Sequence, residues 1–443
     1  MGQRVLIISP HFPPINAADH QRVRMALPYL EQFGWEAHVL AVQPDCIEAG
    51  IEDPFLSKTI PSHIPITYTK ALPVQQTRKL GLGSLGLRSF PYLLQAGDRL
   101  LQQQKFDLVF FSNTVFTSMA LGPRWRKRFG VPYILDFQDP WLNDYYKQSG
   151  VTPPGGRFKY GFSQLQAKLL EPKVVIQASH IISVSPAYPQ ILQRRYPSLN
   201  SSQLTVLPFG APKTDFDLLP SLQIQQRIFD INDRKRHWVY VGRGGEDMAL
   251  ALRSLFSAIQ ADRCQNPETW QTVQLHFVGT SYAPKELATK TVEPIAQEFG
   301  IADLVTEHPQ RIPYFEALQV LAESDAILLI GSSDAGYTAS KLYPCILAQK
   351  PILAIFHQQS SVVDILRHCH AGQAITFASN SKPQDLTASI IRELRNLLTY
   401  SKGWQPPTNW TAFEPYTAFR MTAKLRQIFD QSVAQPVLYS YHA

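Results

Sequence analysis

Short apolar runs alternate along the chain with longer segments of helical periodicity. In the first half, six apolar runs predict strands, at residues 5–9, 36–42, 108–111, 133–136, 180–183 and 204–207. Five periodic segments between them predict helices, at residues 20–33, 91–104, 116–129, 158–177 and 189–196. Because strands that alternate with helices form parallel sheets with both faces covered, the pattern predicts an α/β fold.

A second series of strands and helices begins near His237. Its predicted strands lie at residues 238–241, 274–278, 304–307, 326–330, 352–355 and 374–376. The turn-rich segment Pro208–Thr214 separates the two series, and 443 residues suit two domains. We therefore expect two Rossmann-like, doubly wound domains, residues 1–213 and 214–412, with a last helix at 413–431 that packs back on the first domain. Such domains bind ligands at the carboxyl ends of their strands, in a cleft that they face together.

The composition limits the class of protein. A hydrophobic content of 44% with 17% charged residues is typical of a soluble globular enzyme. No apolar run approaches the roughly 20 residues that a membrane span needs, and the first strand is too short for a signal peptide. Cytoplasm is the expected location. The four cysteines are far apart in the sequence and fit neither metal nor disulfide spacing, so they predict no metal site. We expect neither a metal ion nor a cofactor.

Positive charge is concentrated in the first half of the chain. Residues 1–213 hold 22 Lys and Arg against 13 Asp and Glu, while the remainder holds 20 against 22. This asymmetry favours an acidic partner, such as an anionic membrane or a lipid-linked phosphate. The densest cluster, Arg124–Arg128, is equally well explained as the solvated end of a helix. Signatures of nucleic-acid binding are missing, so no nucleic-acid partner is expected.

The segment at residues 80–94 alternates leucine with glycine beside basic and aromatic residues. It predicts either a loop that touches a membrane or, the interpretation we prefer, a loop packed on its own domain.

The pair Ser340-Lys341 is the strongest candidate for chemistry. It follows the apolar strand predicted at 326–330 and opens a short helix before the strand at 352–355. Free backbone N–H groups at a helix start, together with a lysine charge, are suited to holding a diphosphate.

Four motifs resemble those of the GT-B glycosyltransferases, specifically the retaining family 4. They are Ser9-Pro10-His11-Phe12-Pro13-Pro14 followed by Gln21-Arg22, Asp136-Phe137-Gln138-Asp139-Pro140-Trp141, Tyr240-Val241-Gly242-Arg243, and Ser340-Lys341-Leu342-Tyr343 with Gln349-Lys350-Pro351. The resemblance covers nearly the whole chain and implies the GT-B architecture of two facing Rossmann-like domains.

The chemistry that the resemblance implies is transfer of a sugar from a nucleotide-sugar to a hydroxyl group, with retention at the anomeric carbon. Polysaccharide, glycolipid or cell-surface glycan synthesis would use such transfer, and the acceptor would be a glycan or a lipid-linked molecule. Cations and N–H donors must stabilise the departing diphosphate. The residues implied for donor binding are Gly242, Arg243, Ser340, Lys341, Ile312 and Asn16.

The acceptor would lie on the first domain. Asp139 is the best acid/base or acceptor-orienting candidate, because a carboxylate at the carboxyl end of a strand points into the cleft. Asp136 can instead be structural and hold the turn. The residues predicted on the acceptor side are Asp19, Arg22, Asn113, Asp136 and Gln138.

The chain departs from the family pattern at two acidic positions. The paired Glu of the family fall on Gly336 and Pro344, and Asp334 is the predicted catalytic substitute for the first. The turn after Arg243 also carries Glu246 and Asp247, which would repel a diphosphate or contact a sugar. The alternative is a non-catalytic GT-B protein that binds a nucleotide-sugar or a partner glycosyltransferase; a GT-B epimerase is a weaker third.

Overall fold

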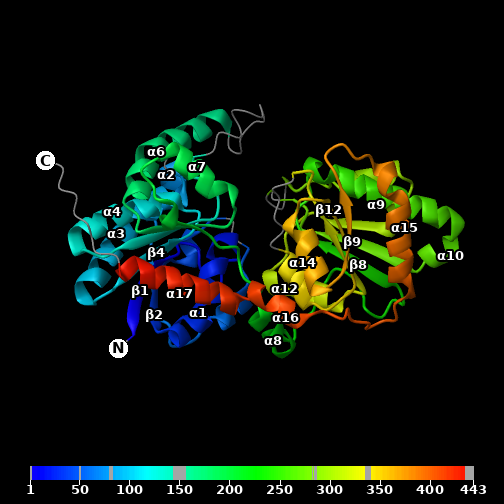
Figure 1. The fold of residues 1–443 in the computed structure, drawn as a ribbon, viewed down its shortest axis with the longest axis horizontal. Helices are drawn as coiled ribbons and strands as arrows, with labels where there is room; N and C mark the ends of the chain where they lie inside the picture. Colours follow the sequence, from blue (N-terminus) through cyan, green and yellow to red (C-terminus); the bar gives the residue numbers. More distant parts are fainter. Residues whose placement is uncertain are drawn as a thin grey trace. The chain divides into compact units, whose positions relative to one another are not determined.

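The chain divides into two compact units. The computed structural model describes residues 2–48, 51–78, 83–142, 156–281, 283, 287–334 and 341–434. Unit 1 comprises Met1–Gly210 and Ala418–Ala443, and unit 2 comprises Ala211–Thr417. The sequence placed this division between residues 213 and 214. Figure 1 shows each unit as a central sheet with helices packed against it.

Unit 1 contains, in its described part, seven parallel strands in the order β3-β2-β1-β4-β5-β6-β7. The strands are β1 Gln3–Ile8, β2 Trp35–Val42, β3 Ile66–Thr69, β4 Leu108–Ser112, β5 Tyr133–Phe137, β6 His180–Ser183 and β7 Leu204–Val206. The helices are α1 Gln21–Leu30, α2 Val74–Thr77, α3 Leu85–Gln103, α4 Leu121–Phe129, α6 Gly156–Ile176, α7 Ala187–Arg195 and α17 Ala418–Ala434.

Both faces of this sheet are buried because alternate strand residues point to opposite sides. Leu6 and Ile8 of β1 belong to a core that α3, α4, α6 and α7 complete. Val5 and Ile7 belong to a second core, closed by α1 and α17. Helix α17 is therefore part of unit 1, although it follows unit 2 in the sequence.

Unit 2 contains, among its described residues, six parallel strands in the order β10-β9-β8-β11-β12-β13. The strands are β8 Arg236–Val241, β9 Val273–Val278, β10 Val305–His308, β11 Ala326–Ile330, β12 Ile352–His357 and β13 Gln373–Phe377. The helices are α8 Lys213–Leu222, α9 Ala249–Gln265, α10 Pro267–Trp270, α11 Glu293–Glu298, α12 Tyr314–Glu323, α13 Leu342–Leu347, α14 Ser361–Cys369, α15 Pro383–Thr399 and α16 Trp410–Phe413. Cores on the two faces enclose alternate residues of β11. The predicted α/β fold with two parallel sheets is confirmed.

The prediction of a loop at residues 80–94 is wrong for its described part. Helix α3 begins at Leu85, six residues before the start predicted at Pro91. The side-chain oxygen of Ser84 caps the helix by accepting a hydrogen bond from the N–H of Leu87. Proline is common at the first position of a helix, and this preference placed the predicted start too late.

Three histidines lie side by side on neighbouring strands of unit 2. Nδ1 of His237 is 3.1 Å from Nε2 of His276, whose ring stacks on that of His308. Burial is the main reason that the pKa of His276 falls to about 3, and the neighbouring His237 and His308 lower it further. The charge of Asp233 opposes this shift in pKa, and the charge of Lys235 adds to it. His276 is therefore neutral in the folded protein at physiological pH.

This row of histidines predicts that unit 2 loses stability in acid. The unfolded chain takes up a proton at His276 below its usual pKa of 6.5, while the folded protein does so only near 3. The unfolded state therefore binds more protons in this range. The free energy of unfolding decreases by about 2 kcal/mol as the pH drops from 6.5 to 5. We expect His276→Gln to reduce this loss in urea unfolding, whereas the exposed His63→Gln leaves it unchanged. An unaltered pH dependence in His276→Gln would contradict the assignment.

Candidate functional site

Three predicted donor residues meet at one edge of the sheet in unit 2. The strand order places β8 beside β11, the point at which the order of the sheet reverses direction. Ligands of open α/β sheets bind outside the carboxyl ends of the strands at such a point. Gly242 and Arg243 follow β8, and Lys341 precedes α13 in the connection that follows β11.

The side chain of Lys341 reaches the strand β8. Its Nζ hydrogen-bonds the Tyr240 hydroxyl and lies 4.2 Å from the centroid of that ring. The hydroxyl in turn donates a hydrogen bond of 2.6 Å to the carbonyl oxygen of Arg243. Burial of the ammonium group is the main reason that the pKa of Lys341 falls to about 7; the charge of Arg243 acts in the same direction, against Cys345 and Asp247. An anion bound beside Lys341 would favour its charged form.

Arg243 is held by a carboxylate of the following turn. Its Nη1 and Nη2 donate to the two carboxylate oxygens of Asp247, at 2.8 and 2.6 Å. This hydrogen bonding is the first cause of the lowered pKa of Asp247. The pair orients the guanidinium group, and it also means that a diphosphate must compete with Asp247 for Arg243.

Gly242 leaves room for the ammonium group of Lys341. A Cβ at this position would lie 2.7 Å from Nζ, and the backbone φ of 155° is one that other residues rarely adopt. Gly242→Ala is therefore expected to displace the ammonium group and to weaken nucleoside diphosphate binding by about ten- to a hundredfold in calorimetry.

Gly300→Ala is the matched control for this substitution. Gly300 also has a positive φ, of 65°, but an added Cβ would meet nothing within 4 Å. If both variants lose the same affinity, backbone strain and not the position of Lys341 explains the effect.

The remaining predicted donor and catalytic residues that the structure describes do not join the group of Gly242, Arg243 and Lys341. Asp334 is exposed, and its N–H donates to the Ser332 hydroxyl at 3.0 Å. Ile312 packs against the core between the sheet and α12–α14. Asn16 lies in unit 1, where its N–H donates to the carbonyl oxygen of Ile51. Ser340 and Gly336 lie outside the described residues.

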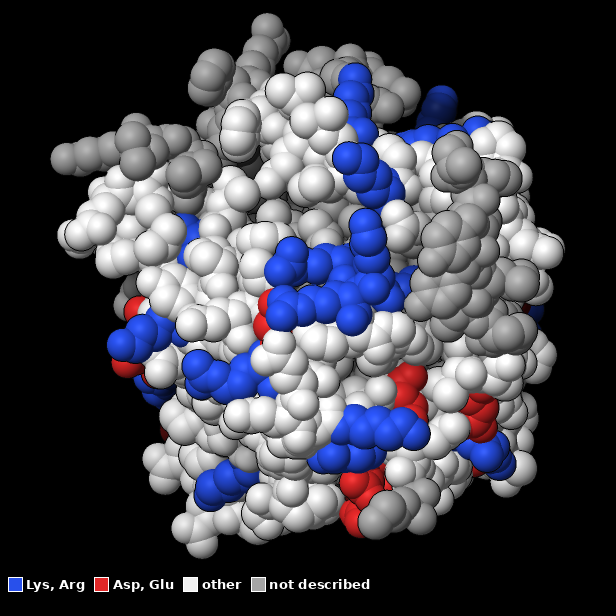
Figure 2. All heavy atoms as spheres, turned by 90° about the vertical axis from the view of Figure 1, so that its left-hand side faces the viewer, with Lys and Arg blue, Asp and Glu red and all other residues white. Residues whose placement is uncertain are grey.

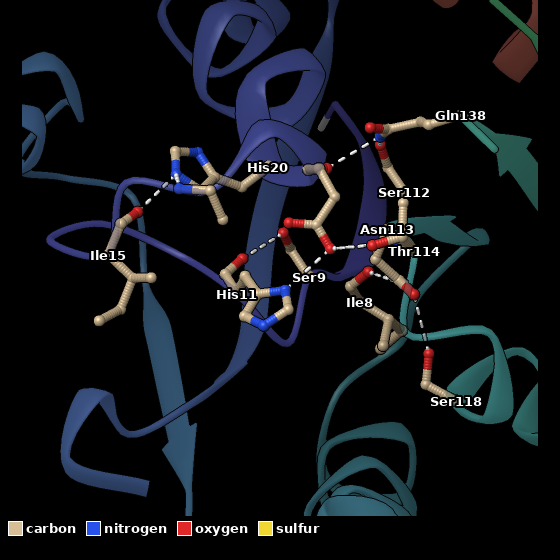
Figure 3. A network of polar contacts seen from close by, with 12 residues as sticks. Ile8, Ser9, His11, Ile15, His20, Ser112, Asn113, Thr114, Ser118 and Gln138 are labelled. Carbon is tan, nitrogen blue, oxygen red and sulfur yellow. Dashed lines mark hydrogen bonds and ion pairs between the residues drawn. The ribbon is translucent and has the colours of Figure 1, made fainter. Parts of the chain in front are cut away.

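Unit 1 has a polar network at the corresponding point of its own sheet (Figure 3). The strand order reverses direction between β1 and β4, and the segments that follow these two strands meet there. Oδ2 of Asp19 accepts hydrogen bonds from Nδ1 of His11 at 2.8 Å and from the N–H and hydroxyl of Thr114 at 3.1 and 2.9 Å. The carbonyl oxygen of Asp19 accepts from the Gln138 amide at 2.8 Å.

The electrostatics keep Asp19 ionised in its pair with His11. Burial alone would raise the pKa of Asp19, but the hydrogen bond and charge of His11, with the N–H of Thr114, lower it to about 2. An ionised carboxylate only accepts, so Nδ1 of His11 carries the proton that it shares. Nε2 takes no part in this pair and is left to hydrogen-bond a hydroxyl group of a ligand.

Arg22 and Asp136 form a fully buried ion pair in the same unit. Nε of Arg22 donates to Oδ2 of Asp136 at 2.6 Å, and neither side chain has any exposed surface. Oδ2 also accepts from the Ser112 hydroxyl, and Nη2 of Arg22 donates to the carbonyl oxygen of Leu207. These contacts favour the structural alternative for Asp136, because a ligand cannot reach the pair without rearrangement.

The other predicted acceptor-side residues differ in accessibility. Asn113 is fully buried, donates to the carbonyl oxygen of Ile8 at 2.9 Å and accepts from Ser118. Asp139 is exposed on the turn after β5, although its surroundings partly desolvate the carboxyl group. That desolvation, together with the charge of Asp19, raises the pKa of Asp139. Asp139 thus keeps the access that a catalytic group needs.

The sequence did not indicate His11 as a site residue, although it lies in a quoted motif. A histidine in the turn after the first strand, with an aspartate eight residues later, was the available signal. In the described part of the chain, no group of three or more His, Cys, Asp or Glu side chains is placed to hold a metal ion.

Comparison with known proteins identifies the fold and one domain. Residues 20–210 match the family described as glycosyl transferase 4-like domain. No curated protein matches the sequence. Among solved structures, HepE of Anabaena with UDP and glucose is 14% identical, with a TM-score of 0.57 over 97% of this chain and 99% of that one.

Two further solved structures match over the same extent. The UDP-forming α,α-trehalose-phosphate synthase of Burkholderia xenovorans is 11% identical, with a TM-score of 0.58 over 98% of this chain and all of that one. A glycosyltransferase of Rickettsia africae is 11% identical, with a TM-score of 0.55 over 98% of this chain and all of that one. At these identities the similarity shows the fold. The chain therefore has the GT-B fold, and its residues 20–210 are similar to the glycosyl transferase 4-like domain.

Proposed function

We propose that the protein is a glycosyltransferase that moves a sugar from a nucleotide-sugar to a hydroxyl group of a glycan or lipid-linked acceptor. The observation that carries this proposal is the position of Lys341 beside Gly242 and Arg243, at the point where the sheet of unit 2 reverses direction. The glycosyl transferase 4-like domain in unit 1 supports it. HepE is known in complex with UDP and with UDP-glucose, which makes uridine nucleotides the first donors to test.

On this proposal, Lys341 stabilises the departing diphosphate. Breaking the bond between C1 of the sugar and the diphosphate leaves negative charge on the phosphate oxygens. Lys341 would take up a proton when the donor binds, because its pKa of about 7 leaves part of the population uncharged beforehand. Arg243 would bind the same diphosphate and Ile312 the nucleotide base. Asp334 would contact the sugar in place of the missing Glu.

The acceptor would bind unit 1 near His11 and Asp139. Nε2 of His11 can hydrogen-bond an acceptor or sugar hydroxyl, and the exposed Asp139 can orient the acceptor or exchange a proton with it. We further propose retention of the anomeric configuration, which proton NMR of the product tests. An inverted product would contradict retention and indicate a single displacement.

A thermal-shift panel of nucleoside diphosphates and nucleotide-sugars tests donor binding. A ligand of the folded state must raise Tm, so we expect a shift with one nucleotide and its sugar conjugates. Absence of a shift with every donor would contradict the proposal. Binding without turnover would instead support a non-catalytic protein. Two observations favour this alternative: Pro344 stands at a family Glu position, and Asp247 already pairs with Arg243.

A further inference from the structure

Helix α6 of unit 1 exposes a row of large apolar side chains. Phe162, Leu165, Leu169 and Ile176 are 47%, 57%, 63% and 50% exposed. Their spacing of three, four and seven residues places them within an arc of about 60° around the helix. The opposite side of α6 carries the buried Ala167 and Val174. The exposed row is therefore a continuous apolar stripe, in contrast to isolated surface residues.

Basic side chains lie on α6 beside this stripe and on the neighbouring helix α4. Lys168 and Lys173 of α6 are exposed, and Arg124, Lys127 and Arg128 of the neighbouring α4 are exposed as well. Arg126 of α4 donates a hydrogen bond to the carbonyl oxygen of Gln177, directly after α6, so the two helices adjoin at this point. Figure 2 shows the side of the molecule on which Figure 1 draws α3 and α4, where Lys and Arg gather in a central cluster with few acidic neighbours.

Little of this positive charge is neutralised within the protein. Asp98 pairs with both Arg124 and Arg128. Among the described residues, no ion pair involves Lys127, Lys168 or Lys173. We define the α4–α6 surface as the exposed apolar row of α6 with the basic residues of α4 and α6.

We propose that the α4–α6 surface docks on an anionic membrane, with the apolar row of α6 inserted among the lipids. An apolar row flanked by lysines matches a bilayer surface, where acyl chains take the apolar groups and anionic headgroups the cations. A nucleic acid would bind the cations and leave Phe162, Leu165 and Leu169 in water. Within the described residues no helix is long and apolar enough to cross a membrane, so α6 would lie along the surface. This inference does not depend on transferase activity.

Vesicle sedimentation of the full chain tests the proposal. We expect binding to vesicles of phosphatidylcholine with phosphatidylglycerol, weakened by salt, and little binding to phosphatidylcholine alone. Lys168→Glu/Lys173→Glu should weaken binding by about 30-fold or more, since each lysine near the surface contributes on the order of 1 kcal/mol. Leu165→Gln/Leu169→Gln should weaken it by about tenfold or more.

Two variants outside the α4–α6 surface serve as matched controls. Lys424→Glu reverses an exposed lysine of α17, and Leu287→Gln changes a leucine of unit 2 that is 69% exposed. Both should bind like the native protein, and all variants should keep its Tm. Absence of binding at low salt would overturn the proposal. So would binding that is lost in the lysine variant but unchanged in the leucine variant, because that result indicates attachment to the headgroups by charge alone, without insertion of the apolar row.

Discussion

Replacing Lys341 by methionine is expected to lower the rate of sugar transfer by about a hundred- to a thousandfold. Methionine keeps most of the volume of the side chain but removes the cation that, on the proposed function, faces the departing diphosphate. The loss should appear mainly in kcat, because the charge on the leaving group is greater in the transition state than in the bound donor. Steady-state release of the nucleoside diphosphate measures it.

The pKa of Lys341 adds a second readout to this experiment. Since its pKa is about 7, most Lys341 is uncharged at pH 8 in the free protein. Donor binding at pH 8 should then take up a proton, and calorimetry in two buffers of different ionisation enthalpy measures this uptake. The uptake should vanish in Lys341→Met.

Lys350→Met is the matched control for Lys341→Met. Lys350 follows α13 at its other end, and burial also lowers its pKa, against the charges of Asp325 and Glu323. It lies at the opposite end of the helix from Arg243, so transfer and proton uptake should both remain. Equal losses in the two variants would show that damage to α13, and not the charge of Lys341, lowers the rate.

Arg22→Met is expected to destabilise unit 1 by about 3–5 kcal/mol, the second large effect. The substitution leaves the ionised Asp136 fully buried without its guanidinium partner. It also removes the donor to the carbonyl oxygen of Leu207 and the contact of the guanidinium group over the ring of Phe209. Hydrogen exchange of the amides in β1, β4 and β5 reports the stability of unit 1 separately from that of unit 2.

The double variant Arg22→Met/Asp136→Asn separates charge from packing. Asparagine removes the buried negative charge and can still accept from the Ser112 hydroxyl. The double variant should therefore be more stable than Arg22→Met alone. If the losses of stability in the two single variants simply add in the double variant, the pair does not interact as the structure describes.

Most of the fold follows from periodicity, because long regular elements carry a strong pattern. The predicted ranges 180–183 and 326–330 coincide with β6 and β11. The edge strand β3 was missed, because Ile66–Thr69 has only four residues and directly follows a proline. The early start of α3 depends on the cap at Ser84, which competes with the proline signal at residue 91.

The candidate site could be predicted only where the sheet dictates it. Arg243 and Lys341 come together because each lies in the segment that follows one of two adjacent strands, β8 for Arg243 and β11 for Lys341. The pairing of Arg243 with Asp247, and of His11 with Asp19, depends on the local conformation of turns. Hydrogen bonds between residues of irregular segments leave no periodic trace in the sequence, so the prediction could name the edge of the sheet but not these partners.

The most direct measurement is turnover of a nucleotide-sugar by the full chain, followed as release of the nucleoside diphosphate. UDP-glucose is the first donor, with other nucleotide-sugars next, and water or a cell-envelope glycan fraction as acceptor. We predict release with one nucleotide class, stimulated by acceptor and lost in Lys341→Met. A donor that binds but is not cleaved with any acceptor, or release that Lys341→Met leaves unchanged, would contradict a glycosyltransferase acting through Lys341.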